Sequence, residues 1–297
     1  MIEKLVSRVS FCRGYRWFTN LFTFIGILSL FISFNGVFDF IPCLFVKIVV
    51  ILVALAVVYV MMHVIAFYVN REKQKRIKEV PISKLGSDKK LYIKFGDLLG
   101  EEITPPEQRT NIVIPFNRCF DIEVDDSLIS RNSLHGKIVN RLIESEKYDK
   151  ASLQEAISSA LRRVSSHGYV PEIADKQIGN SVRYPAGAVA CIPGIRNEYY
   201  FCLGLSKFNQ EKAEPTKSEY ITALDGLVKR IVDLSQGYPV FIPLIGTGLS
   251  GIGVDNKLAL EILIHTIKLR KDEIKSDIFI VLRENLKPLV EDLVHDV

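Results

Sequence analysis

The sequence predicts an α/β protein: a mixed sheet between two helical layers, a three-layer α/β/α sandwich, preceded by an N-terminal two-helix transmembrane hairpin. Three observations predict this architecture. Short apolar runs alternate with helical patterns through most of the chain, two long uncharged apolar runs fill its first quarter, and a glycine-rich loop at 243–253 joins a predicted strand to a predicted helix. We divide the chain into a membrane hairpin with basic flanks, residues 1–80, and an α/β domain, residues 81–297.

The two apolar runs, residues 18–34 and 48–69, contain no charged side chain. A helix needs about 20 apolar residues to cross the hydrocarbon core, and the second run has that length. The first run reaches it when it extends to Phe38. A cleaved signal peptide would have a single, shorter run. Ser29 and Ser33 are spaced for close helix approach, which fits either packing within the hairpin or self-association.

Basic residues flank the predicted hairpin on both sides, and the loop between the two runs has no Lys or Arg before Lys47. The positive-inside bias therefore predicts two passes with both chain termini in the cytoplasm. Much of the net charge of +4 comes from these flanks, so we expect no nucleic-acid partner. The flanking residues are Lys4, Arg8, Arg13, Arg16, Arg71, Lys73, Lys75, Arg76 and Lys78.

The α/β domain contains an alternating series of predicted elements. Apolar runs predict strands at 91–95, 111–116, 186–192, 199–205, 239–242 and 277–282. Helical spacing predicts helices at 133–146, 152–164, 219–234, 257–270 and 286–294. Ser152 and Glu155 have the spacing of a capping box at the start of the second helix.

Ligands of such sheets bind at the loops beyond the strand ends, and three loops are expected to converge there. They are the loop after Phe116, the turn at Gly187, and the glycine-rich loop. Glycines permit positive φ, and main-chain N–H groups beside a helix N-terminus attract phosphate, although such turns also serve plain chain geometry. No Gly-Lys-Ser/Thr follows the glycines and no early GxGxxG occurs. We therefore exclude a P-loop nucleotidase and a dinucleotide dehydrogenase.

The five cysteines, at 12, 43, 119, 191 and 202, form no CxxC pair. We expect reduced thiols and neither a metal site nor a disulfide framework. Cys119 lies beside a candidate ligand loop, but a small buried residue is the favoured interpretation, because no histidine is adjacent to act as its base.

Four segments, in order, resemble the macro domain family, an ADP-ribose-binding fold: FGDL at 95–98, IVIPFN at 112–117, PAGAV at 185–189 and LIGTGLSG at 244–251. The resemblance implies an ADP-ribose derivative as ligand and no cofactor. It implies that Asp97 accepts from the adenine amino group, that Asn117 bonds a ribose hydroxyl, and that the glycine loop binds the diphosphate. For Asp97 the alternative is a turn residue that bonds its own backbone. The implied ligand-binding residues are Asp97, Leu98, Asn117, Arg118, Gly187, Ala188, Gly246, Thr247, Gly248, Leu249, Ser250 and Gly251.

The first loop and the glycine loop depart from the hydrolases of this family. Those enzymes typically carry two asparagines followed by a Gly-Gly-Gly run, whereas here Ile114 stands at the first asparagine position and no glycine run follows. Ser250 replaces the usual aromatic residue of the phosphate loop. We therefore expect a binder without catalytic residues. The alternative is a membrane-tethered ADP-ribosyl hydrolase, in which Asp121 or Asp125 would have to act as base.

Two transmembrane helices before a divergent macro domain resemble the membrane effectors of type II Thoeris antiphage defence. The resemblance implies a signal made by a partner TIR-domain enzyme, plausibly histidine-ADP-ribose. It implies that the effector binds this signal, forms a homo-oligomer and disrupts the bacterial inner membrane, with lipids as further partners. Arg118 and Arg131 are candidates for pairing with a carboxylate on the signal, and ordinary surface arginines are the alternative. A membrane scaffold with a vestigial pocket is a third interpretation.

Overall fold

The computed structural model describes residues 78–86, 88–103, 107–165, 171–174, 178–209, 212–213, 216–247 and 253–290, and six single residues nearer the N-terminus. The chain divides into two compact units, one of Met1–Ile77 with His295–Val297 and one of Lys78–Val294.

The two predicted transmembrane runs lie outside the described residues, apart from single helical positions. Among the residues that the structure describes, no helix has the length and apolarity needed to cross a bilayer. The hairpin and its orientation therefore stay predictions. The single helical positions are Thr23, Gly26, Val46, Val53, Val57 and Met61.

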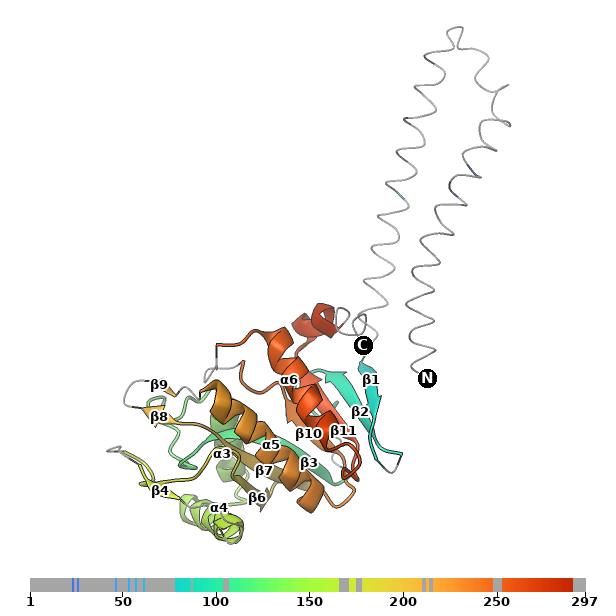
Figure 1. Ribbon diagram of the computed structural model, residues 1–297. Coiled ribbons are helices and arrows are strands. Elements are labelled where there is room, and N and C mark those ends of the chain that lie inside the picture. The colour runs from blue at the N-terminus through green and yellow to red at the C-terminus, as the bar shows by residue number, and fades with distance from the viewer. Residues whose placement is uncertain are drawn as a thin grey trace. The chain divides into compact units, whose positions relative to one another are not determined.

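The larger unit is built on a seven-stranded sheet in the order β1-β2-β11-β10-β3-β7-β6 (Figure 1). The edge strands β1 and β6 run antiparallel to their neighbours, and the strands between them pair in parallel. The mixed sheet is therefore confirmed. Its strands are β1 (Glu79–Lys84), β2 (Lys90–Phe95), β3 (Thr110–Asn117), β6 (Val189–Pro193), β7 (Glu198–Ser206), β10 (Val240–Pro243) and β11 (Ile278–Leu282).

Helices cover both faces of this sheet. Alternate side chains of β3 enter different cores: Ile112 and Ile114 join the hydrophobic cluster that includes α3 and α4, while Val113 joins the cluster that includes α5 and α6. The α/β/α sandwich is thus confirmed for this unit, with α5 and α6 together in front of the sheet in Figure 1. The helices are α3 (Leu134–Glu144), α4 (Lys150–Ser165), α5 (Lys217–Leu234) and α6 (Asn256–Leu269).

Smaller elements complete the described chain. Two short hairpins pair β4 (Glu172–Ile173) with β5 (Val182–Arg183), and β8 (Phe208–Asn209) with β9 (Lys212–Ala213). A 3-10 turn, η1 (Glu284–Leu286), follows β11. The predicted C-terminal helix is helical at 287–290, and its remainder lies outside the described residues.

Strand β1 was not predicted, because Pro81 lies inside it. Proline has no N–H to donate to a ladder, so it is tolerated in a strand mainly at the edge of a sheet. β1 has that position, and its register with β2 shifts between Pro81 and Ser83.

The predicted cap of α4 was wrong by one turn. Asp149, not Ser152, stands before the helix: its Oδ1 accepts from the Ser152 N–H at 2.7 Å, and the Asp149 N–H donates to Ser152 Oγ at 3.0 Å. Glu155 instead accepts from Ser159 and Arg162 along the helix. Aspartate caps a helix as well as serine does. The spacing alone therefore did not decide whether Asp149 or Ser152 is the capping residue.

Helix α5 touches the turn before β6 backbone to backbone. A Cβ on Gly226 would stand 2.6 Å from the Gly187 carbonyl oxygen, and a Cβ on Gly187 would stand 2.8 Å from the carbonyl oxygen of Thr222. Gly187 also has a φ of 86°. Both glycines are therefore required by the close approach of helix and turn.

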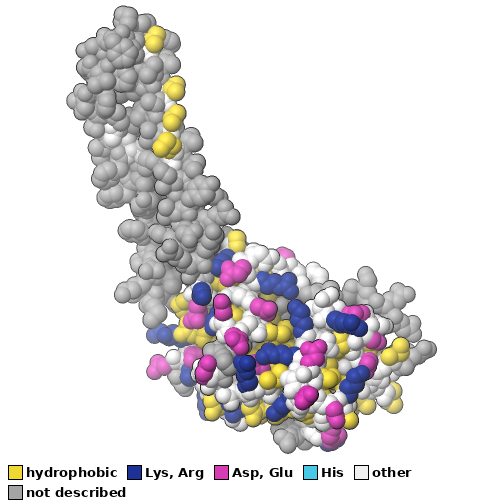
Figure 2. All heavy atoms as spheres, turned by 180° about the vertical axis from the view of Figure 1, so that it is seen from behind, with side chains coloured by type: hydrophobic (Ala, Val, Ile, Leu, Met, Phe, Trp, Pro, Cys, Tyr) yellow, Lys and Arg dark blue, Asp and Glu magenta, His cyan; other side chains and the backbone are white. Residues whose placement is uncertain are grey.

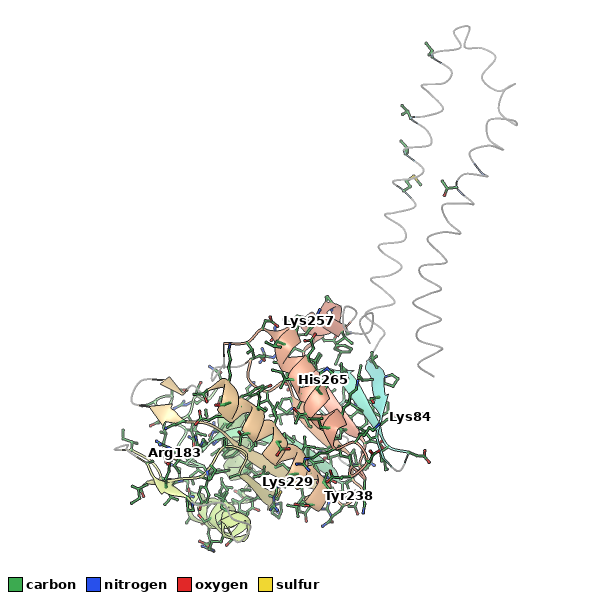
Figure 3. The ribbon with its side chains drawn as sticks, viewed as in Figure 1. Lys84, Arg183, Lys229, Tyr238, Lys257 and His265 are labelled. Carbon is green, nitrogen blue, oxygen red and sulfur yellow. The ribbon has the colours of Figure 1, made fainter. Side chains whose placement is uncertain are left out.

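We predict that Gly226→Ala destabilises the fold. Alanine in a helix interior normally gains about 1 kcal/mol over glycine, but here the contact with Gly187 makes it an overpacked site that costs about 1–3 kcal/mol. Urea unfolding monitored by circular dichroism measures the change. Lys229→Ala, at an exposed position of the same helix (Figure 3), is the control and should change stability by less than about 0.5 kcal/mol. A stabilised Gly226→Ala variant would contradict the contact.

Candidate functional site

The four segments singled out in the sequence lie at strand ends that meet at one edge of the sheet. Leu282 of β11 pairs with Phe95 at the end of β2, and Asn117 at the end of β3 pairs with Ser206 of β7. Phe241 of β10 pairs with Ile112 of β3, and the two strands are parallel. Gly246 follows Phe241 by as many residues as Asn117 follows Ile112, so both lie toward the same edge. The expected convergence of loops is therefore present in the strand register.

The loop after β3 is organised by Asn117. Its Oδ1 accepts from the N–H groups of Cys119 and Asp121, both at 3.2 Å, and its Nδ2 donates to Asp121 Oδ2 at 3.0 Å. Asn117 is buried, with 6% of its surface exposed. An amide nitrogen carries two N–H groups, and the bond to Asp121 uses one of them.

Asp121 is the carboxylate at the centre of this loop. Its Oδ1 accepts from the Asn180 N–H at 2.6 Å, and only 1% of the residue is exposed. Asn180 also donates its Nδ2 to the carbonyls of Cys119 and Phe120 at 3.0 Å. At Gly179 a Cβ would lie 2.4 Å from Asp121 Oδ1. The segment 178–180 is thus locked onto the loop, an association that no pattern in the sequence indicated.

His135 of α3 supports the same loop from the core. Its Nε2 lies 2.9 Å from the carbonyl oxygen of Asp121, so this nitrogen carries the proton, and its ring centroid is 3.6 Å from that of Phe116. Burial lowers the pKa of His135 to about 3. The histidine is therefore neutral at pH 7, and it is a structural donor to the loop.

Arg118 joins the first loop to two other elements. Its Nε donates to the Tyr184 carbonyl at 2.7 Å, and its Nη1 donates to Glu219 of α5 at 2.7 Å. Its side chain is only 10% exposed, and Nη2 lies 4.0 Å from Glu172. Arg118 is therefore no ordinary surface arginine. Glu219 itself is fixed by the Thr216 capping box that opens α5, a pattern present in the sequence but not singled out there.

Arg131, the other arginine candidate, lies apart from this network. It pairs with Asp126 at 3.2 Å, and its side chain is 67% exposed. The same loop is closed by Asp125, whose Oδ1 accepts from the N–H groups of Ser127 and Leu128. The backbone bond from Leu128 lowers the pKa of Asp125.

Asp97 occupies an exposed turn at the end of β2. Its Oδ1 accepts from the Leu99 N–H at 3.2 Å, and its carbonyl oxygen accepts from Gly100 at 2.9 Å. This is the backbone-bonding turn that the sequence allowed as an alternative role. Leu98 is buried in the core, so only its main chain faces the edge of the sheet.

The turn before β6 is satisfied within the fold. The Gly187 N–H donates to the Gly204 carbonyl and the Ala188 N–H donates to that of Pro185. Ala188 is fully buried. These two residues shape the edge next to β7, and their N–H groups already donate to carbonyls of the fold.

The glycine loop begins at Gly246, which has a φ of 89°. Tyr220 of α5 holds the preceding carbonyl oxygen, that of Ile245, at 3.1 Å, and Thr247 Oγ1 lies 3.4 Å from the Leu244 carbonyl. α6 follows, with Asp255 as its N-cap. Gly248, Leu249, Ser250 and Gly251 lie outside the described residues, so their roles stay predictions.

The described residues contain no cluster of three or more side chains suited to a metal ion. Cys119, Cys191 and Cys202 form no disulfide with one another within the described part of the chain. On the face shown in Figure 2, basic and acidic side chains are interspersed over the described surface of the α/β unit.

Comparison with known proteins gives one family match that covers most of the α/β unit. A family model described as the macro domain of the Thoeris protein ThsA matches residues 91–283. A Thoeris protein ThsA from Bacillus amyloliquefaciens (strain Y2) is 28% identical over 159 residues, which make up 52% of this chain and 48% of that protein. The chain therefore spans about half the length of this curated relative.

Solved macrodomains of Oceanobacillus iheyensis are also similar. A mutant of that macrodomain has a TM-score of 0.48 and 14% identity, over 74% of this chain and 100% of its own. The same macrodomain with ADP has a TM-score of 0.46 and 14% identity, over 74% of this chain and 98% of its own. Since both scores lie under 0.5, the family assignment rests on the family model.

We predict that the buried histidine makes the fold sensitive to acid. A histidine whose pKa is lower in the folded than in the unfolded chain stabilises the fold fully above pH 6.5, and that contribution is lost as pH falls toward 3. Between pH 7 and pH 5 the wild type should lose about 2 kcal/mol from His135. His135→Gln keeps a donor for the Asp121 carbonyl but does not titrate. In urea unfolding, the free energy that this variant loses between pH 7 and pH 5 should therefore be smaller than the wild-type loss by about 2 kcal/mol.

The matched control is His265→Gln, at an exposed position of α6 that Figure 3 labels. This variant retains His135 and should lose as much stability between pH 7 and pH 5 as the wild type. Equal pH sensitivity of His135→Gln and wild type would refute the role of the buried imidazole.

Proposed function

The chain belongs to the macro domain family of the Thoeris protein ThsA, and from this premise we propose that it is a membrane-anchored sensor of an ADP-ribose-derived nucleotide. The single observation that carries the proposal is the strand register. It brings Asp97, Asn117 and Gly246, which are far apart in sequence, to the ends of strands at one edge of the sheet. Ligands of open α/β sheets bind at that edge.

The glycine loop supplies the diphosphate site in this proposal. Gly246 turns the chain with positive φ, and the loop then leads into the N-terminus of α6. Main-chain N–H groups in such a loop, together with the helix dipole, favour an anion without lysine. Tyr220 fixes where the loop starts by holding the Ile245 carbonyl.

The remaining parts of the nucleotide have candidate partners on either side. The second N–H of Asn117 Nδ2 is a donor for a ribose hydroxyl, held in place by the bonds that its oxygen makes within the loop. Asp97 is exposed and uses Oδ1 for its own turn, which leaves Oδ2 as the acceptor for the adenine amino group.

Arg118 is the residue best placed to read a carboxylate on the distal group, as a histidine-ADP-ribose signal would carry. Glu219 and Tyr184 fix its Nη1 and Nε, and Nη2 has an ion-pair contact only at 4.0 Å, with Glu172. A guanidinium held in this way can offer its remaining N–H groups to a carboxylate. Arg131, exposed and paired with Asp126, is the weaker candidate.

We favour binding over hydrolysis because the two candidate bases are poorly suited to that role. Asp121 is buried and accepts from Asn117 and Asn180. Asp125 is engaged by two main-chain N–H groups, and the bond from Leu128 lowers its pKa. A lowered pKa makes the Asp125 carboxylate a weaker proton acceptor.

We further propose that residues 1–80 anchor the sensor in the bacterial inner membrane, with both termini in the cytoplasm. In this proposal a TIR-domain enzyme makes the signal, and occupancy favours a homo-oligomer whose hairpins perturb the bilayer. The signal can drive such a change only through different affinities for the two states.

Gly246→Ala tests the phosphate loop. Alanine is strained at a φ of 89°, so the loop should shift and the affinity for ADP-ribose and histidine-ADP-ribose should fall at least about tenfold in isothermal titration calorimetry. Gly237→Ala is the matched control: its φ is 81°, and a Cβ there would meet only the Lys275 carbonyl at 3.9 Å. Gly237→Ala should lower the free energy of unfolding about as much as Gly246→Ala does, and it should leave the affinity for both nucleotides unchanged.

Equal loss of affinity in both variants would show a general effect of strain and would refute the loop assignment. The same titrations, followed by chromatography of the nucleotides, should show no turnover. Product formation that Asn117→Ala abolishes would establish the hydrolase instead.

The membrane mechanism predicts that a chain starting at Lys78 binds the signal as tightly as the full chain but does not arrest growth. The division at Ile77 separates the two compact units, so the truncation leaves the α/β unit whole. Growth of cells that produce the TIR enzyme with either chain measures the difference. Growth arrest by the shortened chain would refute the role of the hairpin.

A further inference from the structure

A cavity of about 560 Å³ lies at the edge of the sheet opposite the one that carries Asp97, Asn117 and Gly246. Arg109 directly precedes β3, Tyr199 is the second residue of β7, and Arg230 lies in the last turns of α5. From Tyr199, β7 runs roughly 20 Å before it reaches the Asn117 edge. Figure 3 marks the two edges, with Tyr238 at this one and Lys257, at the start of α6, at the other.

Arg109 is held in this cavity without a carboxylate. Its guanidinium carbon lies 4.1 Å from the centre of the Tyr199 ring and 4.4 Å from that of Tyr238. Its Nη1 donates to Gln236 Oε1 at 3.0 Å. Within the described chain no ion pair involves Arg109, and its buried Nε has no hydrogen-bond partner. The residue is therefore a positive charge that two aromatic rings and an amide oxygen hold in place, without an ion-pair partner among the described residues.

Arg230 is the second guanidinium of the cavity, and its side chain is 13% exposed. Among the described residues its buried Nε has no partner, and its ion-pair partner, Asp233 on the next turn, is 3.8 Å from Nη1 and half exposed. Burying a charge without close hydrogen-bonded compensation is costly. An anion bound next to Arg230 would therefore offset part of the free-energy cost of burying its charge.

The rest of the lining is largely apolar or aromatic, with Tyr199, Phe201 and Leu234 among its residues. Two guanidinium groups and one carboxylate, that of Asp233, leave an excess of one positive charge. The volume lies in the range of small-molecule sites, about 300–1,000 Å³. We propose that this cavity is a second ligand site, distinct from the loops at the carboxyl edge, and that it binds a small organic anion with an apolar body.

The test uses the full-length chain in a neutral detergent, with phenyl phosphate as the probe and benzyl alcohol as its uncharged analogue. Calorimetry should show that the chain binds phenyl phosphate and does not bind benzyl alcohol. Arg230→Gln should weaken phenyl phosphate at least tenfold, whereas Arg230→Lys, which keeps the charge, should stay within about threefold of wild type. Asp233→Asn removes the competing carboxylate and should tighten binding about threefold, a gain that a merely structural role of Arg230 does not predict.

Phosphate is also attracted to the glycine loop, so every titration is repeated in the Gly246→Ala background. The proposal expects the same phenyl phosphate affinity there, whatever that substitution does to ADP-ribose binding. The proposal would be overturned if Gly246→Ala abolished the binding of phenyl phosphate while Arg230→Gln left that binding unchanged. Should Arg230→Gln fail to fold, as judged by its melting temperature, weaker binding by Asp233→Asn would overturn it equally.

Discussion

The carboxylate of Asp121 is the constraint on which the candidate site depends. A buried charge persists only when hydrogen-bond donors surround it, and the donors here come from Asn117 in the same loop and from Asn180 beyond α4. Through its main chain, Asp121 also binds His135 of α3. One residue therefore fixes the position of Asn117, the segment 178–180 and the helix behind them. The loop gains rigidity from this network, which is consistent with the binding role that we propose.

Main-chain and side-chain groups both hold the loops at this edge of the sheet in place. The N–H groups of the turn at Gly187 donate to carbonyls within the fold, and Tyr220 holds the start of the glycine loop. Arg118 is tied to the capping box of α5 through Glu219. α5 thus contacts three parts of the site, and its close approach at Gly226 is what brings them together.

The fold and the edge that carries the site could be predicted from sequence because both are local patterns repeated along the chain. Apolar runs mark the inner strands, and glycines mark where the backbone must turn. β1 was missed because Pro81 is tolerated only through its edge position, which is a property of the whole sheet. The contacts of Asn180 with the first loop, 60 residues away in sequence, rest on tertiary packing and have no local signature. The cavity that contains Arg109 and Arg230 could not be predicted either, because its two arginines come from separate elements.

The backbone contact between Gly187 and Gly226 also links two distant positions in any variant of this chain. A side chain at either one requires α5 to stand farther from the sheet, and that displacement would carry Glu219 and Tyr220 with it. Substitutions at the two positions should therefore behave non-additively. In related sequences without structures, the residue pair at these positions therefore indicates how closely this helix approaches the sheet.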